Sequence, residues 1–343
     1  MATPKISVVV PVYNAEEFLS HTLSMLAGQS LQDIEILIID DGSSDSSPKI
    51  LQDFAATDAR VKLFQQSNCG VSVARNKGIE KSTGDFITFL DSDDFYGNDR
   101  YLETLYLDAT RNNQLISGAS FVNYRSSEYV EDDFSQSPFY CGYTFNDNKL
   151  INYNEYQFDY GFHRFIFHKS LFSNGQNRFC NLSFYEDPVF LVKIMHQAKS
   201  FFACSDAQYF YRAESSQRQW DTNKILALME GVRMNMQFAH SENLALLYWY
   251  TLNHFNKESG ACEVGANRRV NLRIVDESLN EIEQEFDANL YSSGARDSGF
   301  CSSAEDLLFN FDLRQVINDY TKLPYHTKLR RSAGFELRKL GLR

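Results

Sequence analysis

Short runs of β-branched and other apolar residues alternate with helical patterns through the first 90 residues of the chain. The runs cover residues 6–10, 34–39 and 86–90, with a shorter one at 61–64. Because residues of this kind at nearly every position suit a strand buried on both faces, the runs predict strands of a parallel sheet. Strands that alternate with helices are typical of a doubly wound α/β sheet with right-handed crossovers. Asn14 is expected to be the N-cap of the first helix.

Acidic residues follow two of these predicted strands. Asp40 and Asp41 come directly after the second run, and Asp91, Asp93 and Asp94 come after the fourth. The carboxyl ends of parallel strands meet at one edge of a sheet, so one ligand could contact both groups. Clustered carboxylates repel one another, and Mg²⁺ or Mn²⁺ binds one or two carboxylates together with substrate phosphates. The alternative is an Asp-rich turn that caps the following helix.

The composition indicates a soluble globular protein with room for two domains. The chain has 343 residues, of which 43% are hydrophobic and 23% are charged. Its net charge of −12 argues against a general nucleic-acid binder. The six cysteines contain no CxxC pair, which favours a reduced, cytosolic chain over a zinc or disulfide protein. We see neither a signal peptide nor an apolar run near the ~20 residues of a membrane helix.

The character of the sequence changes near residue 220. Residues 124–158 show no clear periodicity and are expected to form an insertion or loops, and residues 201–212 a strand pair. Long amphipathic helices are expected beyond them, at residues 225–238, 244–255 and 271–286, with another at 309–317. The predicted domains are a catalytic domain (1–220), a helical domain (221–321) and a basic amphipathic tail (322–343).

Four motifs, in this order and spacing, resemble the N-terminal half of glycosyltransferase family 2, which has the GT-A fold. They are Ser7–Asn14, Ile39–Asp45, Asn68–Gly70 with Ala74–Gly78, and Leu90–Asp94. Residues 185–190 resemble the acidic pair that opens the acceptor-side helix of the family, and residues 209–216 resemble its late tyrosine-arginine-serine segment. The resemblance covers roughly residues 5–216.

The resemblance implies an inverting, metal-dependent transfer from a UDP-sugar. The group transferred would be a hexosyl or N-acetylhexosaminyl group, and the acceptor a hydroxyl of a glycan or a lipid-linked glycan in bacterial surface-polysaccharide synthesis, such as capsule or lipopolysaccharide. The cofactor would be Mn²⁺ or Mg²⁺, which stabilises the charge of the leaving diphosphate.

The family pattern also assigns roles to single residues. It makes Asp93 the direct metal ligand and Asp187, supported by Glu186, the base that deprotonates the acceptor hydroxyl. Asp41 is expected to accept a hydrogen bond from uracil. The residues expected to bind the nucleotide-sugar are Pro11, Val12, Tyr13, Asp41, Asn68, Gly70, Arg75, Asp91 and Ser92; those expected on the acceptor or diphosphate side are His163, Arg212 and Ser215.

Simpler roles remain open for several of these residues. Glu186 and Asp187 could cap the helix after Pro188, which is a favoured first residue of a helix. Arg75 could be a structural partner of the aspartates, and Tyr13 could be a core residue.

Other functions fit less well. A nucleotidyltransferase normally has a Gly-rich, basic phosphate loop after its first strand, and residues 11–14 are not one. The intact acidic set (Asp41, Asp91, Asp93 and Asp187) argues against a catalytically inactive carbohydrate-binding or assembly subunit.

The C-terminal tail is basic. Residues 322–343 contain seven Lys or Arg residues and one acid, interleaved with apolar residues. Such a segment predicts peripheral contact with an anionic membrane, next to a lipid-linked acceptor, on the inner face of the cell membrane. The alternatives are a solvated tail and an oligomer contact. A homo-oligomer formed through the helical domain is a further expectation.

Overall fold

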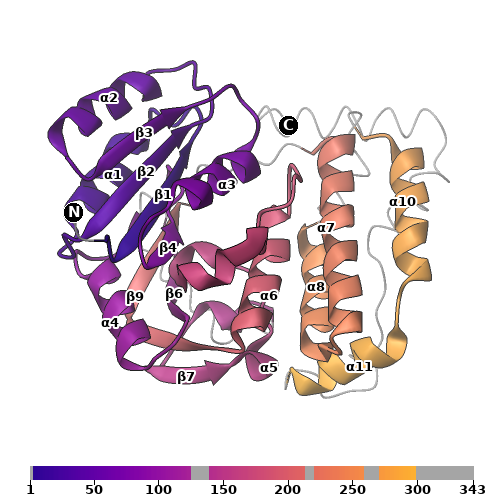
Figure 1. The fold of residues 1–343 in the computed structure, drawn as a ribbon. Helices are drawn as coiled ribbons and strands as arrows, with labels where there is room; N and C mark the ends of the chain where they lie inside the picture. The colour runs from indigo at the N-terminus through magenta and orange to yellow at the C-terminus, as the bar shows by residue number, and fades with distance from the viewer. Residues whose placement is uncertain (1–2, 125–138, 213–219, 259–269, 299–343) are drawn as a thin grey trace, which may run out of the picture. The chain divides into compact units, whose positions relative to one another are not determined.

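The computed structural model describes residues 3–124, 139–212, 220–258 and 270–298 of the chain. It divides into two compact units (Figure 1). The first unit, which the sequence predicts to be catalytic and which is therefore called the catalytic unit, comprises residues 1–181 and 186–217, and the helical unit comprises residues 182–185 and 218–343. The division after residue 217 lies next to the expected boundary at 220, whereas residues 182–185 were expected in the catalytic domain.

The catalytic unit contains a mixed sheet that is covered by helices (Figure 1). Its first half is β1 (Ile6–Val12), α1 (Leu19–Ala27), β2 (Ile34–Asp40), α2 (Ser47–Thr57), β3 (Val61–Gln65), α3 (Val71–Lys81) and β4 (Phe86–Phe89). Its second half is β5 (Phe95–Tyr96), α4 (Tyr101–Arg111), β6 (Ile116–Tyr124), β7 (Lys149–Asn152), α5 (Tyr153–Tyr156), β8 (Phe165–His168), α6 (Glu186–Ala198) and β9 (Ser200–Arg212).

The strand order of the sheet is β3-β2-β1-β4-β8-β6-β9-β5, and β7 pairs with β9. Strand β1 is parallel to β2 and β4, and β2 is parallel to β3, as the sequence predicted. Strand β8 is antiparallel to both β4 and β6, which makes the sheet mixed. Both acidic strand ends, after β2 and after β4, therefore lie at one edge of the sheet.

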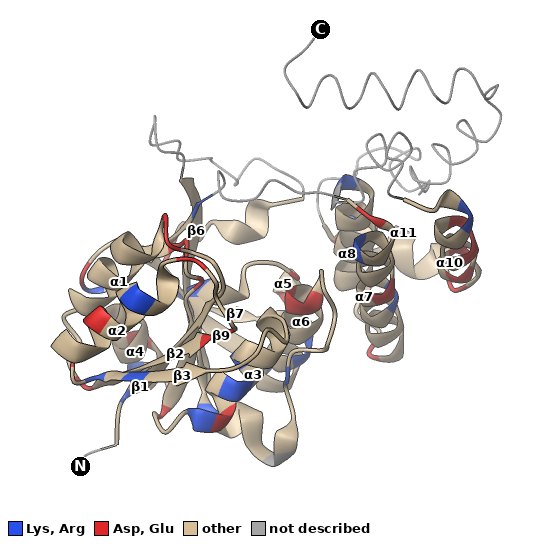
Figure 2. Cartoon of the chain, turned by 90° about the horizontal axis from the view of Figure 1, so that it is seen from above, with Lys and Arg blue, Asp and Glu red and all other residues tan. Residues whose placement is uncertain are grey.

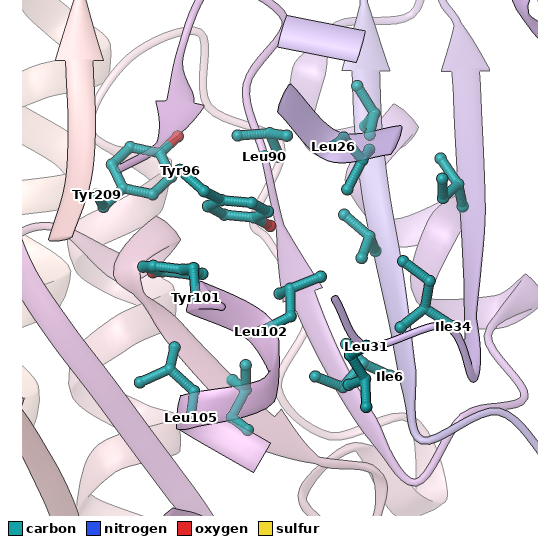
Figure 3. Close-up of a cluster of buried hydrophobic side chains, with 14 of the residues drawn as sticks. Ile6, Leu26, Leu31, Ile34, Leu90, Tyr96, Tyr101, Leu102, Leu105 and Tyr209 are labelled. Atoms are coloured by element: carbon teal, nitrogen blue, oxygen red, sulfur yellow. The ribbon is translucent and has the colours of Figure 1, made fainter. Parts of the chain in front are cut away.

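The core on one face of the sheet extends to the candidate site. Leu90, Tyr96, Tyr101 and Tyr209 lie close together in it (Figure 3). The rings of Tyr96 and Tyr101 stack with centroids 4.2 Å apart, and the Tyr101 hydroxyl donates a hydrogen bond to the Arg164 carbonyl. This packing fixes the place of Tyr209, which carries its hydroxyl to the acidic loop after β4.

The glycine inside α3 is explained by close packing on β1. A Cβ atom at Gly78 would lie 2.2 Å from a methyl group of Val9. Glycine in a helix interior costs about 1 kcal/mol relative to alanine, and the approach of α3 to the sheet requires it here.

Three local predictions were wrong. Helix α1 begins at Leu19 with Phe18 as its N-cap, because Asn14 takes a left-handed φ of 49° and its side chain accepts a hydrogen bond from the Ser44 N–H. Residues 200–212 form one long strand rather than a pair, and residues 202–204 and 208–212 of it pair with β6 on either side of one shift of register. The acidic turn does not cap α4, which begins at Tyr101 with Arg100 as its N-cap.

The helical unit contains α7 (Thr222–Ser241), α8 (Ala245–Glu258), α10 (Leu272–Gln284) and α11 (Ala288–Asp297). The first three confirm the expected helices, whereas residues 309–317 and the tail lie outside the described residues. Acidic residues lie along α10 (Figure 2), and Arg233 of α7 contacts Glu281 in this helix and Glu285 at its C-terminal end. No helix in the described part of the chain has the length and apolarity to cross a membrane.

Candidate active site

The loop after β4 brings three carboxylates together. Residues 91–93 are half-buried and Asp94 is fully buried. Asp94 accepts hydrogen bonds from the Tyr209 hydroxyl and from the Arg212 backbone N–H, both at 2.8 Å. Burial, with the charges of the other two aspartates, holds the pKa of Asp94 well above its usual range. Asp94 is therefore a structural anchor that ties the acidic loop to β9.

Arg75 joins this loop to Glu186, one of the two acidic residues predicted to act as the general base. It lies on α3 with 4% of its surface exposed. One terminal nitrogen donates to both oxygens of Asp91, at 2.9 and 3.1 Å, and the other donates to Glu186 Oε1 at 2.8 Å. Burial opposes ionisation of Asp91, but the charges of Arg75 and His163 outweigh it and hold the pKa of Asp91 well below its usual range. The structural role that the sequence left open for Arg75 is thus present.

His163 contacts the same aspartate. Its Nε2 lies 3.0 Å from Asp91 Oδ2, and its ring stacks on Tyr209 with centroids 5.5 Å apart. Its Nδ1 is buried and makes no hydrogen bond in the described part of the chain. The structure therefore places His163 beside Asp91, which is predicted to bind the nucleotide-sugar.

The two acidic residues predicted to form the general base lie at the start of α6. Glu186 and Asp187 lie in the first turn of this helix, which begins at Glu186, so the alternative that they cap a helix whose first residue is Pro188 was wrong. Burial first, and then the negative charge of Glu186, raise the pKa of Asp187 well above its usual range, although Arg75 opposes the shift. A half-buried carboxylate with a raised pKa suits a general base.

Asp41 organises the loop before α3. Its carboxylate accepts hydrogen bonds from the Cys69 N–H at 2.9 Å, the Gly70 N–H at 2.8 Å and the Gln66 side chain at 2.8 Å, and 3% of the residue is exposed. Gly70 has a φ of 91°, which favours glycine. The uracil contact expected of Asp41 stays a prediction. The loop that Asp41 holds also contains Asn68 and Gly70, two residues predicted to bind the nucleotide-sugar.

The other predicted nucleotide-binding residues lie at the end of β1. Pro11 and Val12 are buried, whereas Tyr13 is 51% exposed, so the alternative that Tyr13 is a core residue was wrong. The Val12 carbonyl accepts a hydrogen bond from the Asp41 N–H. An exposed ring at the carboxyl edge of the sheet is available to a ligand.

Arg212 holds the backbone of the acidic loop. Its Nε donates to the Asp93 carbonyl at 2.9 Å, and its guanidinium lies over the rings of Phe18 and Tyr124. Ser215, predicted for the same side, lies outside the described residues.

Asp93 and its neighbours fit a divalent cation that is shared with a ligand. In the described ranges, no three His, Cys, Asp or Glu side chains form a group that could hold a metal ion. Besides burial, repulsion from Asp93 and Asp91 raises the pKa of Asp94, and a cation beside Asp93 would relieve this repulsion. Mg²⁺ and Mn²⁺ are commonly held by one or two carboxylates plus substrate phosphates.

Sequence reasoning missed the clamp made by Asn76. Its side chain donates to the Phe179 carbonyl at 2.8 Å and accepts from the Phe179 N–H at 2.9 Å. Asn76 follows Arg75 directly, so two adjacent residues of α3 hold the chain on either side of residues 182–185. The motif Ala74–Gly78 contained the signal, but not the identity of the distant partner.

The sequence has relatives among named glycosyltransferases. The Bacillus subtilis protein named "uncharacterized glycosyltransferase EpsJ" is 30% identical over 61% of this chain and 61% of its own length. The "minor teichoic acid biosynthesis protein GgaA" of the same organism is 30% identical over 64% of this chain and 50% of its own. The chain thus spans less than two thirds of each of these relatives.

Solved structures share the fold. The crystal structure of S. aureus TarS 1–349 matches with a TM-score of 0.66 at 19% identity, over 94% of this chain and 93% of that one. Its complex with UDP-GlcNAc matches with a TM-score of 0.62 at 18% identity, over 98% and 92%. The mannosyltransferase PcManGT of Pyrobaculum calidifontis, solved with GDP-Man and Mn²⁺, matches with a TM-score of 0.52 at 13% identity, over 94% and 87%. These matches and the mixed sheet confirm the GT-A fold.

The family model described as "Glycosyl transferase family 2" matches residues 7–174, from the first residue of the first motif to beyond the acidic loop. Residues 7–174, just under half of the chain, thus match glycosyl transferase family 2.

Proposed function

We propose that the chain moves a hexosyl or N-acetylhexosaminyl group from a UDP-sugar to a hydroxyl of a glycan or lipid-linked acceptor, with inversion at the anomeric carbon. The observation that carries the proposal is the bridge from Asp91 through Arg75 to Glu186, two partners that lie 16 and 111 positions from Arg75 in the sequence. The bridge joins the predicted nucleotide-sugar side of the site to the acidic pair predicted to act as the general base. TarS binding UDP-GlcNAc supports the donor class, and the role of GgaA in teichoic acid synthesis supports a surface polysaccharide.

Asp187 acts as the base in this proposal. The acceptor oxygen forms a bond to the anomeric carbon while the bond from that carbon to the diphosphate oxygen breaks on the opposite face. The hydroxyl proton passes to Asp187, whose raised pKa makes it a stronger base than an ordinary aspartate. Glu186, which is ion-paired with Arg75, lies beside Asp187.

The donor is proposed to lie at the carboxyl edge of the sheet. Pro11, Val12 and the exposed Tyr13 form the wall against the uracil ring. Asn68, Gly70 and Asp41 lie on the ribose side. Asp93 is the proposed ligand of Mg²⁺ or Mn²⁺, with Asp91 and Ser92 next to it. When bound, the cation supplies positive charge that stabilises the leaving diphosphate. His163 and Arg212 are proposed to face the diphosphate or acceptor.

A nucleotide and metal screen tests this function. UDP with Mn²⁺ is expected to raise the Tm by several degrees, since a ligand at 100 times its Kd stabilises a protein by about 2.7 kcal/mol. EDTA, or Asp93→Asn, should remove most of that shift. One UDP-sugar, with UDP-GlcNAc tested first, should release UDP slowly in the presence of metal. If neither UDP nor GDP shifts the Tm with either metal, the proposal is wrong.

The basic tail is proposed to bring the enzyme to an anionic membrane on the cytoplasmic face. Each Lys or Arg near such a surface contributes about 1 kcal/mol. Deleting residues 322–343 is therefore expected to abolish co-sedimentation with phosphatidylglycerol vesicles and to leave the Tm and UDP-induced shift unchanged. Equal binding of the truncated and full chains, or no binding of the full chain, would contradict the membrane role.

A further inference from the structure

The chain passes from the helical unit to the catalytic unit at the peptide bond between Tyr185 and Glu186. This bond comes directly before Glu186 and Asp187, the acidic pair proposed to act as the general base. Residues 182–185 belong to the helical unit, and Glu186 begins α6 of the catalytic unit. Tyr185 is the last residue of this short segment of the helical unit. Only Glu186 separates it from Asp187.

Tyr185 has an unusual backbone conformation. Its φ of 67° lies in the left-handed region, which a bulky residue rarely adopts. Its side chain is almost completely buried, with 2% of the residue exposed. Such a conformation persists only where the surroundings determine it, and residues of this kind concentrate at functional sites.

Gly231 of α7 provides the surroundings. A Cβ atom at this position would lie 2.8 Å from Cδ1 of the Tyr185 ring, 3.1 Å from its Cβ and 3.2 Å from its carbonyl oxygen. Gly231 lies inside a helix of 20 residues, where alanine is the more favourable residue. The missing side chain therefore leaves room for both the ring and the backbone of Tyr185.

The preceding residue is attached to the same helix. The ring of Phe184 makes an edge contact with Trp220, with centroids 5.5 Å apart, and the Lys224 ammonium lies 5.1 Å from the centre of the Phe184 ring. Two consecutive residues thus bind to the helical unit, one at the start of α7 and one near its middle.

We propose that Tyr185 is a positioning residue for the base. Its contact with Gly231 holds it in the left-handed conformation, and this conformation sets the direction in which Glu186 and Asp187 enter α6. The helical unit would then act in catalysis through the chain itself. The inference rests on the proposed function, in which Asp187 is the base.

Gly231→Ala is the direct test. The added methyl group must displace Tyr185, so kcat is expected to fall 10- to 100-fold, the scale of a misplacement of about 1 Å. The KM for the UDP-sugar and the UDP-induced shift in Tm should stay within twofold of the wild type, because the donor side is untouched. Tyr185→Ala should lower kcat to a similar extent, whereas Tyr185→Phe, which keeps the ring, should retain it.

A double variant separates positioning from damage to the helix. Removing the ring removes the closest contact of the methyl group and leaves only the Cβ and carbonyl oxygen of residue 185 nearby, so Gly231→Ala with Tyr185→Ala should cost much less beyond Tyr185→Ala than Gly231→Ala costs alone. Asn223→Ala, at an exposed position of the same helix, is the control and should match the wild type.

Two results would overturn the inference. One is that both single variants fold and keep kcat within twofold; the other is that the losses in the double variant multiply. Failure of the proposed function gives a different result, because Asp187→Asn would then keep its activity, or the wild type would not respond to UDP.

Discussion

Asp187→Asn is expected to lower kcat by about 10²- to 10⁴-fold, the usual contribution of a general base. The amide cannot accept the proton of the acceptor hydroxyl, whereas the donor side of the site is unchanged. The KM for the UDP-sugar and the UDP-induced shift in Tm should therefore stay near the wild-type values. Single-turnover measurements of UDP release with acceptor present give the required rate constant, and wild-type turnover in the variant would rule Asp187 out as the base.

Stability provides the control for this variant. The pKa of Asp187 is raised in the folded chain, first by burial and then by Glu186, so its protonated form is favoured. The associated stability is full below the unfolded pKa of about 3.9 and is lost as the pH rises through the folded pKa. At neutral pH the ionised group is thus unfavourable, and Asp187→Asn should keep or raise the Tm. A fall in Tm would show that the loss of activity comes from unfolding.

The pH profile gives an independent readout of the same base. Asp187 must be ionised to accept a proton, so kcat/KM should fall as the pH drops through its raised pKa. The acidic limb is expected above about 3.9, the ordinary value for aspartate. Glu186→Gln removes the neighbouring charge and should move that limb to lower pH. A limb that does not move would show that Asp187 does not set it.

The sequence predicted the parts of the fold that leave a local pattern. The run at Ile34–Ile39 indicates a buried strand because parallel strands are covered on both faces, and the acids after it follow from the end of that strand. The length of strand β9 cannot be predicted from a local pattern, because its partner β6 lies far away in the sequence and the pairing of the two strands shifts register once. Helix α11 was missed because it is short and has few apolar residues, although Asp287 caps it.

The candidate site shows the same limit. The sequence predicts that Asp91 and Asp187 belong to one site, but not what joins them, because Arg75 reaches Glu186 across 111 positions. Likewise, no sequence pattern predicts the Tyr209–Asp94 hydrogen bond or the left-handed conformation of Tyr185. Each depends on packing between distant elements, which no window of the sequence contains.

Arg75→Met is expected to lower both stability and activity. The guanidinium is buried between Asp91 and Glu186, and removing one partner of a buried ion pair costs about 3–5 kcal/mol because the remaining charges are left unpaired. Met fills similar volume, so the loss is mainly electrostatic. Chemical denaturation measures it. Arg75→Lys keeps the charge, but a single ammonium cannot reproduce the fork that binds two carboxylates, so an intermediate loss is expected.

The pH dependence of this loss has a definite sign. Arg75 helps to hold the pKa of Asp91 below its usual range, against the effect of burial. The stability gained is present above the unfolded pKa of about 3.9 and is lost as the pH falls through the lower folded pKa. The difference between the wild type and Arg75→Met should therefore be largest near neutral pH and shrink below about pH 4. A difference independent of pH would point to packing instead of charge.

Arg75→Met combined with Glu186→Gln separates the structural part of the bridge from its catalytic part. Neutralising Glu186 removes one of the two unpaired charges, so the double variant should recover part of the stability that Arg75→Met loses. Its kcat should stay low, because the Arg75 bridge between Asp91 and residue 186 and the charge beside Asp187 are both gone. Recovery of activity together with stability would mean that the bridge only supports the fold, and that its position between the two acidic groups has no part in the transfer.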